Sequence, residues 1–144
     1  MKKDLDHYLN NESIITLFPI GWVANDFDEP TPMDILRQAD SEIILKPEYR
    51  DGLKGIQVGD HIMVLFHFHL SAEDCDLIQH PRRDKNRKPR GVFSMCSPRR
   101  PNRIGTTVVE IIEMNENHLR VRGLDAINHT PVIDIKPANR VRSP

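Results

Sequence analysis

Arginines gather in one stretch of the chain where prolines and glycines restrict the backbone. Residues 90–105 read RGVFSMCSPRRPNRIG, which contains four arginines, two prolines and two glycines. Proline fixes φ and removes a backbone donor, and glycine lets the backbone approach a ligand closely. A guanidinium on such a loop can present two N–H donors to two oxygens of a phosphate or carboxylate. The same spacing also allows Arg99 or Arg100 simply to satisfy carbonyls of its own loop.

The distribution of charge along the chain favours an anionic partner. The net charge is −1, yet residues 82–103 hold nine Lys or Arg against one Asp, so this segment carries +8 and the remainder −9. A concentrated positive segment is typical of nucleic-acid binding, although a solvated charged loop has the same composition. The residues predicted to contact nucleic acid are Arg82, Arg83, Lys85, Arg87, Lys88, Arg90, Arg99 and Arg103.

Two further residue types raise the question of metal or nucleophilic chemistry. His67 and His69 are two positions apart, so they share one face of an apolar strand. No third ligand has recognisable spacing, and such a pair is more typical of a hydrogen-bonded core or a pocket wall, so no metal is predicted. Cys75 and Cys96 fit neither a disulfide framework nor a zinc motif. Both are interpreted as free thiols.

Short apolar runs, separated by turn residues at intervals of about ten, must position these side chains. The longest alternation, over residues 61–70, places Phe66 and Phe68 on one face and His67 and His69 on the other. A helical turn or two is predicted for residues 71–79. The pattern predicts an all-β protein, a small antiparallel β-barrel with few short helices. Strands are predicted in residues 14–24, 41–45, 61–70, 106–114, 118–123 and 132–136.

The length of 144 residues suits a single domain. Residues 1–12 are expected to form an N-terminal extension and residues 13–144 the barrel domain. No apolar run approaches the roughly 18 residues that a membrane span needs, and no apolar signal segment follows the first residues. A cytoplasmic protein without a membrane partner is therefore predicted.

Two adjoining blocks carry a resemblance to a known family. The stretches RGVFSMCSPRRPNRIGTTVVEI and LRVRGLDAINHTPVIDIKP are similar to RGVFATRSPxRPNPIG and LDxxDGTPVxDIKPY of the TsaA-like, or TrmO, family. Further similarity extends the resemblance over about residues 17–137. It implies an antiparallel barrel that binds S-adenosylmethionine, usually as a homodimer with the cofactor site near the interface. The implied reaction is methylation of N6 of a threonylcarbamoylated adenosine in tRNA.

The resemblance also implies a set of site residues. Methyl transfer to N6 would benefit from a group that accepts the nitrogen's proton, for which His69, Asp125 and Asp134 are candidates. Positioning without a dedicated base is equally acceptable. The residues implied to contact S-adenosylmethionine are Pro30, Thr31, Pro32, His69, Leu70, Cys96, Arg100, Val108, Asp125, Ala126, Ile127 and Asn128.

The chain departs from the family pattern within this set. Residues 30–32 read PTP where the family has PRQ, Leu70 replaces a glutamine, and Cys96 replaces the first arginine of the motif. Two alternatives to the methyltransferase therefore stay open. One is a non-catalytic module that binds S-adenosylmethionine or nucleic acid. The other is a small-molecule methyltransferase, for which the acidic loop at residues 26–34 could bind a basic substrate.

Overall fold

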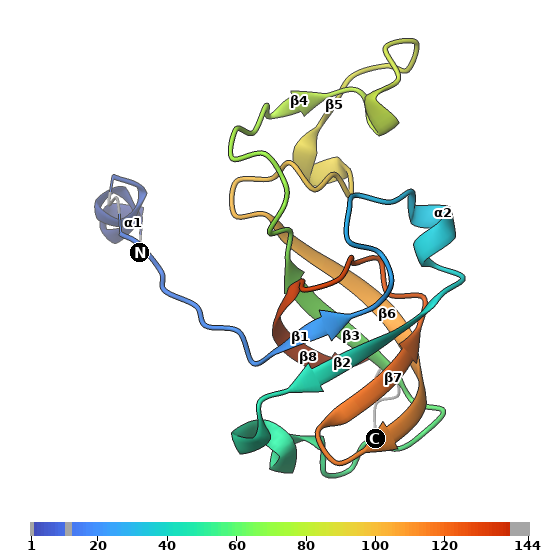
Figure 1. The fold of residues 1–144 in the computed structure, drawn as a ribbon. Coiled ribbons are helices and arrows are strands. Elements are labelled where there is room, and N and C mark those ends of the chain that lie inside the picture. Colours follow the sequence, from blue (N-terminus) through green and yellow to red (C-terminus); the bar gives the residue numbers. More distant parts are fainter. Residues whose placement is uncertain (1, 11–12, 139–144) are drawn as a thin grey trace.

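A computed structural model describes residues 2–10 and 13–138 (Figure 1). The predicted extension at residues 1–12 therefore lies partly outside the described residues, as does the end of the predicted domain at residues 139–144. Within the extension, the chain forms helix α1 (Lys2–Leu9). None of the helices in the described ranges is long and apolar enough to cross a membrane.

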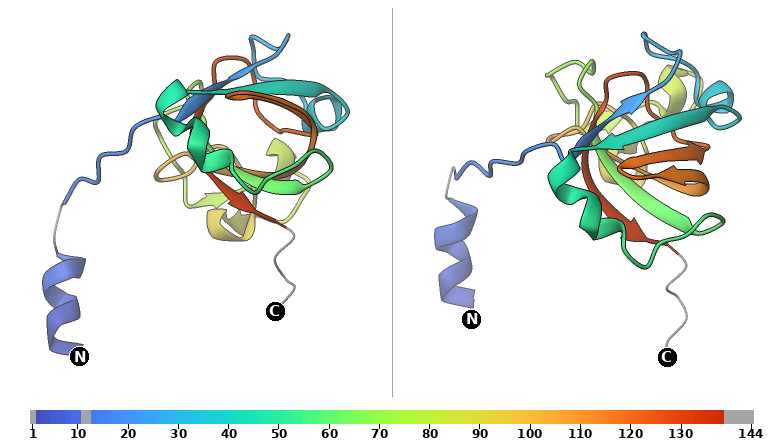
Figure 2. Two further views of the ribbon diagram at one scale, coloured as in Figure 1. Left: turned by 90° about the horizontal axis from the view of Figure 1, so that it is seen from below. Right: turned by 60° about the horizontal axis from the view of Figure 1, so that its bottom comes forward.

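Six antiparallel strands close into a barrel, which Figure 2 shows from its lower end and from a tilted side. Their order around the barrel is β1-β2-β7-β6-β3-β8, and every pair is antiparallel. The predicted fold class is confirmed. The strands are β1 (Gly21–Ala24), β2 (Asp40–Leu45), β3 (His61–His67), β6 (Ile104–Asn115), β7 (His118–Arg122) and β8 (Pro131–Pro137).

The remaining elements lie in the connections between barrel strands. Most of the segment between β3 and β6 rises above one end of the barrel in Figure 1, and we call residues 71–103 of this segment the arm. It contains a small two-stranded sheet, β4 (Ile78–Gln79) paired with β5 (Arg90–Gly91). The short helices of the connections are α2 (Met33–Leu36) and the 3-10 turns η1 (Pro47–Leu53), η2 (Pro81–Arg83) and η3 (Val92–Ser94).

Strand β3 illustrates how the sequence builds the core. Ile62, Val64 and Phe66 are almost fully buried, because alternate side chains of a strand point to the same face and this face lines the barrel. Valine, isoleucine and leucine side chains of the other strands, with a few residues of the connections, fill the rest of the interior. Removing such a side chain from water stabilises the fold by about 1.5–3 kcal/mol each.

The first strand is shorter than predicted. Residues 14–24 were expected to form one interrupted strand, but only Gly21–Ala24 is a strand. Ile20 still donates its N–H to the Val132 carbonyl at 2.8 Å. Pro19 has no N–H to continue this ladder, and the preceding residues are exposed, Ile14 by 91% and Ile15 by 83%.

The helical turn predicted at residues 71–79 is wrong. This segment is irregular and ends in β4. Its polar side chains bind nearby carbonyls, such as the Asp76 carbonyl for the Gln79 amide at 2.6 Å, and also carbonyls on the opposite side of the arm. The Ser71 hydroxyl donates to the Pro98 carbonyl at 3.0 Å, and the Gln79 amide donates to the Arg99 carbonyl at 2.9 Å. The Ser71 side chain is thus used as a cross-link within the arm.

Candidate ligand pocket and basic groove

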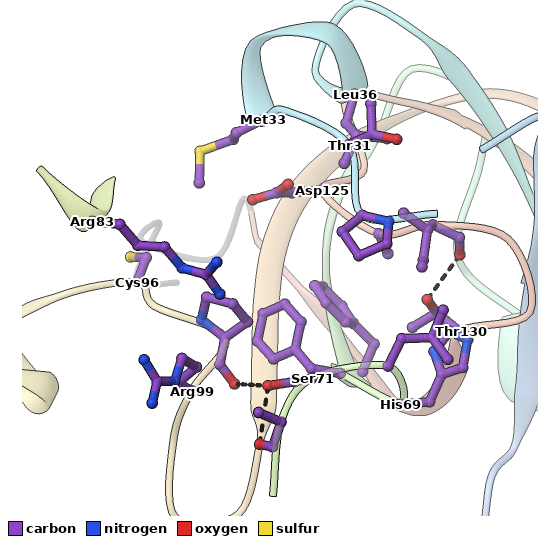
Figure 3. A pocket seen from close by; sticks show the side chains of 18 residues that line it. Thr31, Met33, Leu36, His69, Ser71, Arg83, Cys96, Arg99, Asp125 and Thr130 are labelled. Carbon is purple, nitrogen blue, oxygen red and sulfur yellow. Dashed lines mark hydrogen bonds between the residues drawn. The ribbon is translucent and has the colours of Figure 1, made fainter. Parts of the chain in front are cut away.

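Four segments that are distant in sequence meet at the end of the barrel beneath the arm. They are the connection that includes α2, the end of β3, the arm, and the connection between β7 and β8. Together they enclose a cavity of about 290 Å³, which we call the pocket (Figure 3). This volume is near the lower limit of typical small-molecule sites.

The pocket brings together most of the residues implied to contact the cofactor. Those that line it are Pro30, Thr31, His69, Leu70, Cys96, Asp125, Ala126 and Ile127. They come from all four segments, so their proximity in space does not follow from proximity in sequence.

Four residues of the implied set are not among those that line the pocket. The Pro32 carbonyl accepts N–H bonds from Ile35 and Leu36 at the start of α2. Val108 lies on β6 and is 49% exposed. Asn128 faces a neighbouring loop, where its side chain donates to Asp28 at 2.8 Å.

Arg100, the fourth, is used inside the arm. Its guanidinium Nη1 donates to the carbonyls of Met95 at 2.7 Å and Val92 at 3.1 Å. These are the carbonyl contacts that the sequence left open for Arg99 or Arg100. Arg100 therefore shapes the loop from within.

Aromatic side chains form the apolar floor of the pocket. Phe66 and Phe68 meet edge to face, with ring centroids 5.2 Å apart and an interplanar angle of 77°. His69 reaches the same pocket although the alternation placed it on the opposite face. The reason is that strand β3 ends at His67, so the chain turns before His69.

Gly105 makes this floor possible. A Cβ at this position would lie 2.6 Å from Phe66 Cε2 and 2.7 Å from Phe68 Cζ, closer than real Cβ atoms approach. Glycine permits the two rings to pack directly against the backbone of β6.

A polar cluster fixes the wall that carries Asp125. The Asn25 amide donates to Ser41 Oγ at 3.0 Å and to the Ala126 carbonyl at 2.9 Å. Thr130 Oγ1 donates to the Ile127 carbonyl at 2.8 Å. These contacts satisfy buried polar groups and hold the connection between β7 and β8 against β1 and β2.

Several pocket and supporting residues were missed from the sequence. The polar cluster around Asn25 had no recognisable motif, and the loop residues meet only in the folded chain. The alternation of β3 was the one signal that could have identified the aromatic floor. The missed lining residues are Met33, Leu36, Phe66, Phe68, Ser71, Ala72, Arg83, Pro98, Arg99 and Thr130.

Two titratable side chains in the pocket have shifted pKa values. Burial raises the pKa of Asp125, and Arg37 opposes this effect. Burial lowers the pKa of His69, as do the nearby His67 and His129. The His69 imidazole is therefore neutral at neutral pH and can accept a proton.

Asp134 is placed elsewhere. It lies on β8, where its carboxylate pairs with Lys136 Nζ at 3.2 Å, and it does not line the pocket. The spacing of these two residues on one strand face suggested this pair. Of the three candidate proton acceptors, only His69 and Asp125 face the pocket.

The cations of the arm fall into two groups. Arg87 pairs with Asp84, Arg99 pairs with Asp74 and Asp76, and Arg103 donates to the Ser71 carbonyl. The second group has no hydrogen-bond or ion-pair partner for its side chains within the described part of the chain. It comprises Arg82, Arg83, Lys85, Lys88 and Arg90.

A second cavity, the basic groove, lies along the arm. Its volume is about 740 Å³, and Arg82, Lys85 and Arg90 are among its lining residues. The groove and the pocket share Met33, Arg83, Cys96, Pro98 and Arg99. The two cavities are therefore adjacent, with arginines at their junction.

A metal site in the described ranges, 2–10 and 13–138, would require a group of ligating side chains. No group of three or more His, Cys, Asp or Glu residues there could hold a metal ion.

The fold and the site define a class of small antiparallel barrel proteins whose ligand pocket is formed by loops at one barrel end. Within this class, residues 22–140 match the family described as tRNA-methyltransferase O N-terminal domain. The chain belongs to this family, which confirms the resemblance seen in the sequence.

Known proteins similar to the chain include archaeal and bacterial examples. One is a probable S-adenosyl-L-methionine-binding protein of Methanothermobacter thermautotrophicus, 45% identical over 85% of this chain and 89% of that protein. Another is an S-adenosyl-L-methionine-binding protein of Archaeoglobus fulgidus, which is 44% identical over 83% of this chain and 86% of that protein. The crystal structure of TrmO from Pseudomonas aeruginosa superposes with a TM-score of 0.67 at 27% identity and covers 92% of this chain. The chain spans 61% of that TrmO chain.

Proposed function

We propose that the pocket binds S-adenosylmethionine. The observation that carries the proposal is the convergence of eight implied contact residues from four segments around one cavity. The residues fit such a ligand: an aromatic floor suits an adenine ring, and a carboxylate such as Asp125 can accept hydrogen bonds from hydroxyl or amino groups. The names of the archaeal relatives support the same ligand.

The proposed reaction is methyl transfer to N6 of a modified adenosine in tRNA. The cofactor would supply a methyl group already activated by a sulfonium, so no metal or covalent enzyme intermediate is needed. The protein's part is to position the acceptor, exclude water and take up a proton. His69 is our candidate for the proton acceptor, because it lines the pocket and its lowered pKa keeps the imidazole neutral.

The basic groove is the proposed tRNA-binding surface. Four of the five unpartnered cations of the arm, Arg82, Arg83, Lys85 and Arg90, line this groove, where they are available to phosphates. The groove adjoins the pocket, so a nucleotide bound along the arm could place its base at the pocket entrance. The family description as a tRNA-methyltransferase domain supports this substrate class.

The test uses the purified protein with S-adenosylmethionine carrying a labelled methyl group and unfractionated tRNA. We expect label to enter the tRNA and to be recovered as an N6-methylated adenosine derivative after nuclease digestion. His69→Gln should lower kcat by a larger factor than it raises the Kd for S-adenosylmethionine, because a proton acceptor contributes mainly in the transition state while His69 also lines the pocket. Absence of cofactor binding by calorimetry would refute the whole proposal.

A second candidate is a module that binds S-adenosylmethionine without catalysis. It is favoured by the relatives that match over nearly their whole length, since their names state binding alone. Cofactor binding with no label transfer to tRNA, at any pH between 6 and 9, would select this candidate.

A homodimer with the cofactor site near the interface is part of the proposal. The exposed apolar side chains next to β1, such as Ile15, Leu17 and Phe18, are consistent with a covered surface. Light scattering coupled to size exclusion should give twice the chain mass of 16.6 kDa. A monomeric mass would remove this part of the proposal.

A further inference from the structure

Arg83 is an arm residue that reaches into the pocket. It lines the pocket as well as the basic groove, and Figure 3 shows its side chain extending from the arm past Cys96 toward the cavity. Its neighbour Arg82 lines the groove alone. The two arginines therefore share one turn and the groove, and Arg83 alone of the two also lines the pocket.

The guanidinium of Arg83 has no protein partner. Within the described residues it makes no ion pair or side-chain hydrogen bond, whereas the adjacent Asp84 pairs with Arg87 at 3.6 Å. The other arginine of the pocket lining, Arg99, is already paired with Asp74 and Asp76. These two ion pairs use only Nη2 of Arg99, and its Nε is buried without a partner in the described residues. Arg83 is the arginine of the pocket lining whose whole guanidinium has no ion pair or hydrogen bond there.

The backbone at this turn is held in an uncommon conformation. Arg82 and Arg83 have φ values of 55° and 59°, in the left-handed region that non-glycine residues seldom adopt. The N–H of Arg83 donates to the His80 carbonyl at 3.0 Å, which closes the turn. Both arginines are presented from this turn, and Arg83 lines the pocket in addition to the groove.

The pocket has a carboxyl group on one wall and a guanidinium on another. The carboxyl of Asp125 lines it from the connection between β7 and β8, and the Arg83 guanidinium lines it from the arm. The floor between them is apolar. An elongated ligand with a hydrogen-bond donor group at one end and an anionic group at the other matches this arrangement.

We propose that Arg83 binds the carboxylate of the amino-acid end of S-adenosylmethionine. This inference rests on the proposed function and adds a specificity-determining residue to its site. Cys96, which stands where the family motif has an arginine, lines the pocket beside Arg83. Arg83 thus supplies a guanidinium from the arm near a position where this chain lacks one. The cofactor site then includes the arm as well as the barrel.

The test compares two ligands and three variants by calorimetry. The ligands are S-adenosylmethionine and its decarboxylated analogue, which lacks only the carboxylate. The variants are Arg83→Gln, Arg83→Lys and the control Arg82→Gln, which removes the same charge from the same turn at a similar φ. Thermal unfolding of each variant should match that of the wild type, because both arginines are exposed.

We expect Arg83→Gln to weaken binding of S-adenosylmethionine about 10- to 100-fold. Its affinity for the decarboxylated analogue should stay within about twofold of the wild-type value. The affinity of Arg83→Lys for S-adenosylmethionine should lie between those of the wild type and Arg83→Gln, because lysine keeps the charge and loses the paired donor geometry. Arg82→Gln should bind both ligands like the wild type.

Four results would count against the inference. Equal effects of Arg83→Gln and Arg82→Gln would show a general charge effect, and equal losses for both ligands would exclude the carboxylate as the group that is bound. Failure of the wild type to bind S-adenosylmethionine would overturn the proposed function itself. Wild-type binding that Arg83→Gln leaves unchanged would overturn this inference alone.

Discussion

At the scale of single residues, the pocket depends on what one position lacks. Phe66 and Phe68 can form its floor only because residue 105 has no side chain. A methyl group there would have to displace two rings that are packed edge to face in the core. Close-packed interiors tolerate such insertions poorly.

Gly105→Ala should therefore lower the free energy of unfolding by about 1–3 kcal/mol, measured by urea denaturation. Gly91→Ala is the control, because no atom lies within 4 Å of a Cβ at that position and its φ of −66° suits alanine. The control should stay within about 0.5 kcal/mol of the wild type. Similar stabilities for the two variants would show that the floor relaxes around the added methyl group.

The Asp125 carboxyl makes stability depend on pH. Because burial raises its pKa, the folded protein holds this proton more tightly than the unfolded chain does. The unfolding free energy therefore falls as pH rises from the ordinary value of 3.8 through the raised folded pKa, and stays lower above it. Asp125→Asn lacks this titration, so its stability relative to the wild type should increase across that window.

Urea denaturation of the wild type and Asp125→Asn at several pH values measures this difference. A stability difference that is independent of pH, or one that shifts in favour of the wild type as pH rises, would contradict the assigned cause.

At the scale of elements, the arm is held together by side chains that bind its own carbonyls. Arg100 joins η3 to the residues that follow it, and Ser97 Oγ donates to Gln79 Oε1 at 2.7 Å between the two sides of the arm. Apolar burial contributes little there, since Val92 is the arm's buried hydrophobic residue. Segments of this kind open locally at lower cost than a barrel strand.

Arg100→Ala should loosen the arm and leave the barrel intact. Hydrogen exchange at the amides of residues 92–97 should accelerate about tenfold or more, because two carbonyls lose a charged donor. Exchange in β3 and β6 should not change. Arg90→Ala, which removes an unpartnered arginine from the same arm, is the control, and an equal effect of the two variants would contradict the role given to Arg100.

The difference between the barrel strands and the arm explains what the sequence could predict. The strands of the barrel follow from local alternation and turn residues, and five of the six predicted strands lie close to their observed positions. The helical turn at residues 71–79 was wrong because Ser71 and Gln79 bind carbonyls more than 19 positions away in sequence. The pocket residues that were anticipated came from motif resemblance. Asn25 was missed, and Arg83 was predicted only as a nucleic-acid contact, because their places at the pocket depend on contacts between loops that no local pattern encodes.

At the scale of the whole molecule, positive charge is concentrated in one part of the arm, residues 82–103. The net charge of +8 on residues 82–103 is offset by a net charge of −9 on the rest of the chain. A nearly neutral protein therefore presents a basic surface next to its pocket. The barrel arginines are paired: Arg122 binds Asp40 at 2.9 Å and Arg120 binds Glu113 at 3.4 Å. A polyanion is therefore expected to bind to the arm in preference to the barrel.

Salt dependence tests this expectation. Replacing Arg82 and Lys85 together with Gln should reduce the slope of log Kd for tRNA against log salt concentration by about 1–2, because each phosphate contact contributes about 0.7–0.9. Replacing Arg120 and Arg122 together with Gln removes the same charge from β7 and should leave the slope unchanged. Equal slopes for the two double variants would assign binding to net charge instead of to the arm.

The central claim, that S-adenosylmethionine occupies the pocket, is tested most directly by hydrogen–deuterium exchange with and without saturating cofactor. The account predicts slower exchange in the segments that line the pocket, residues 30–36, 66–72, 96–99 and 125–130, with little change in strands β6 and β7, which contribute no residue to its lining. Protection confined to other segments, or no change in exchange anywhere at saturating concentration, would contradict it.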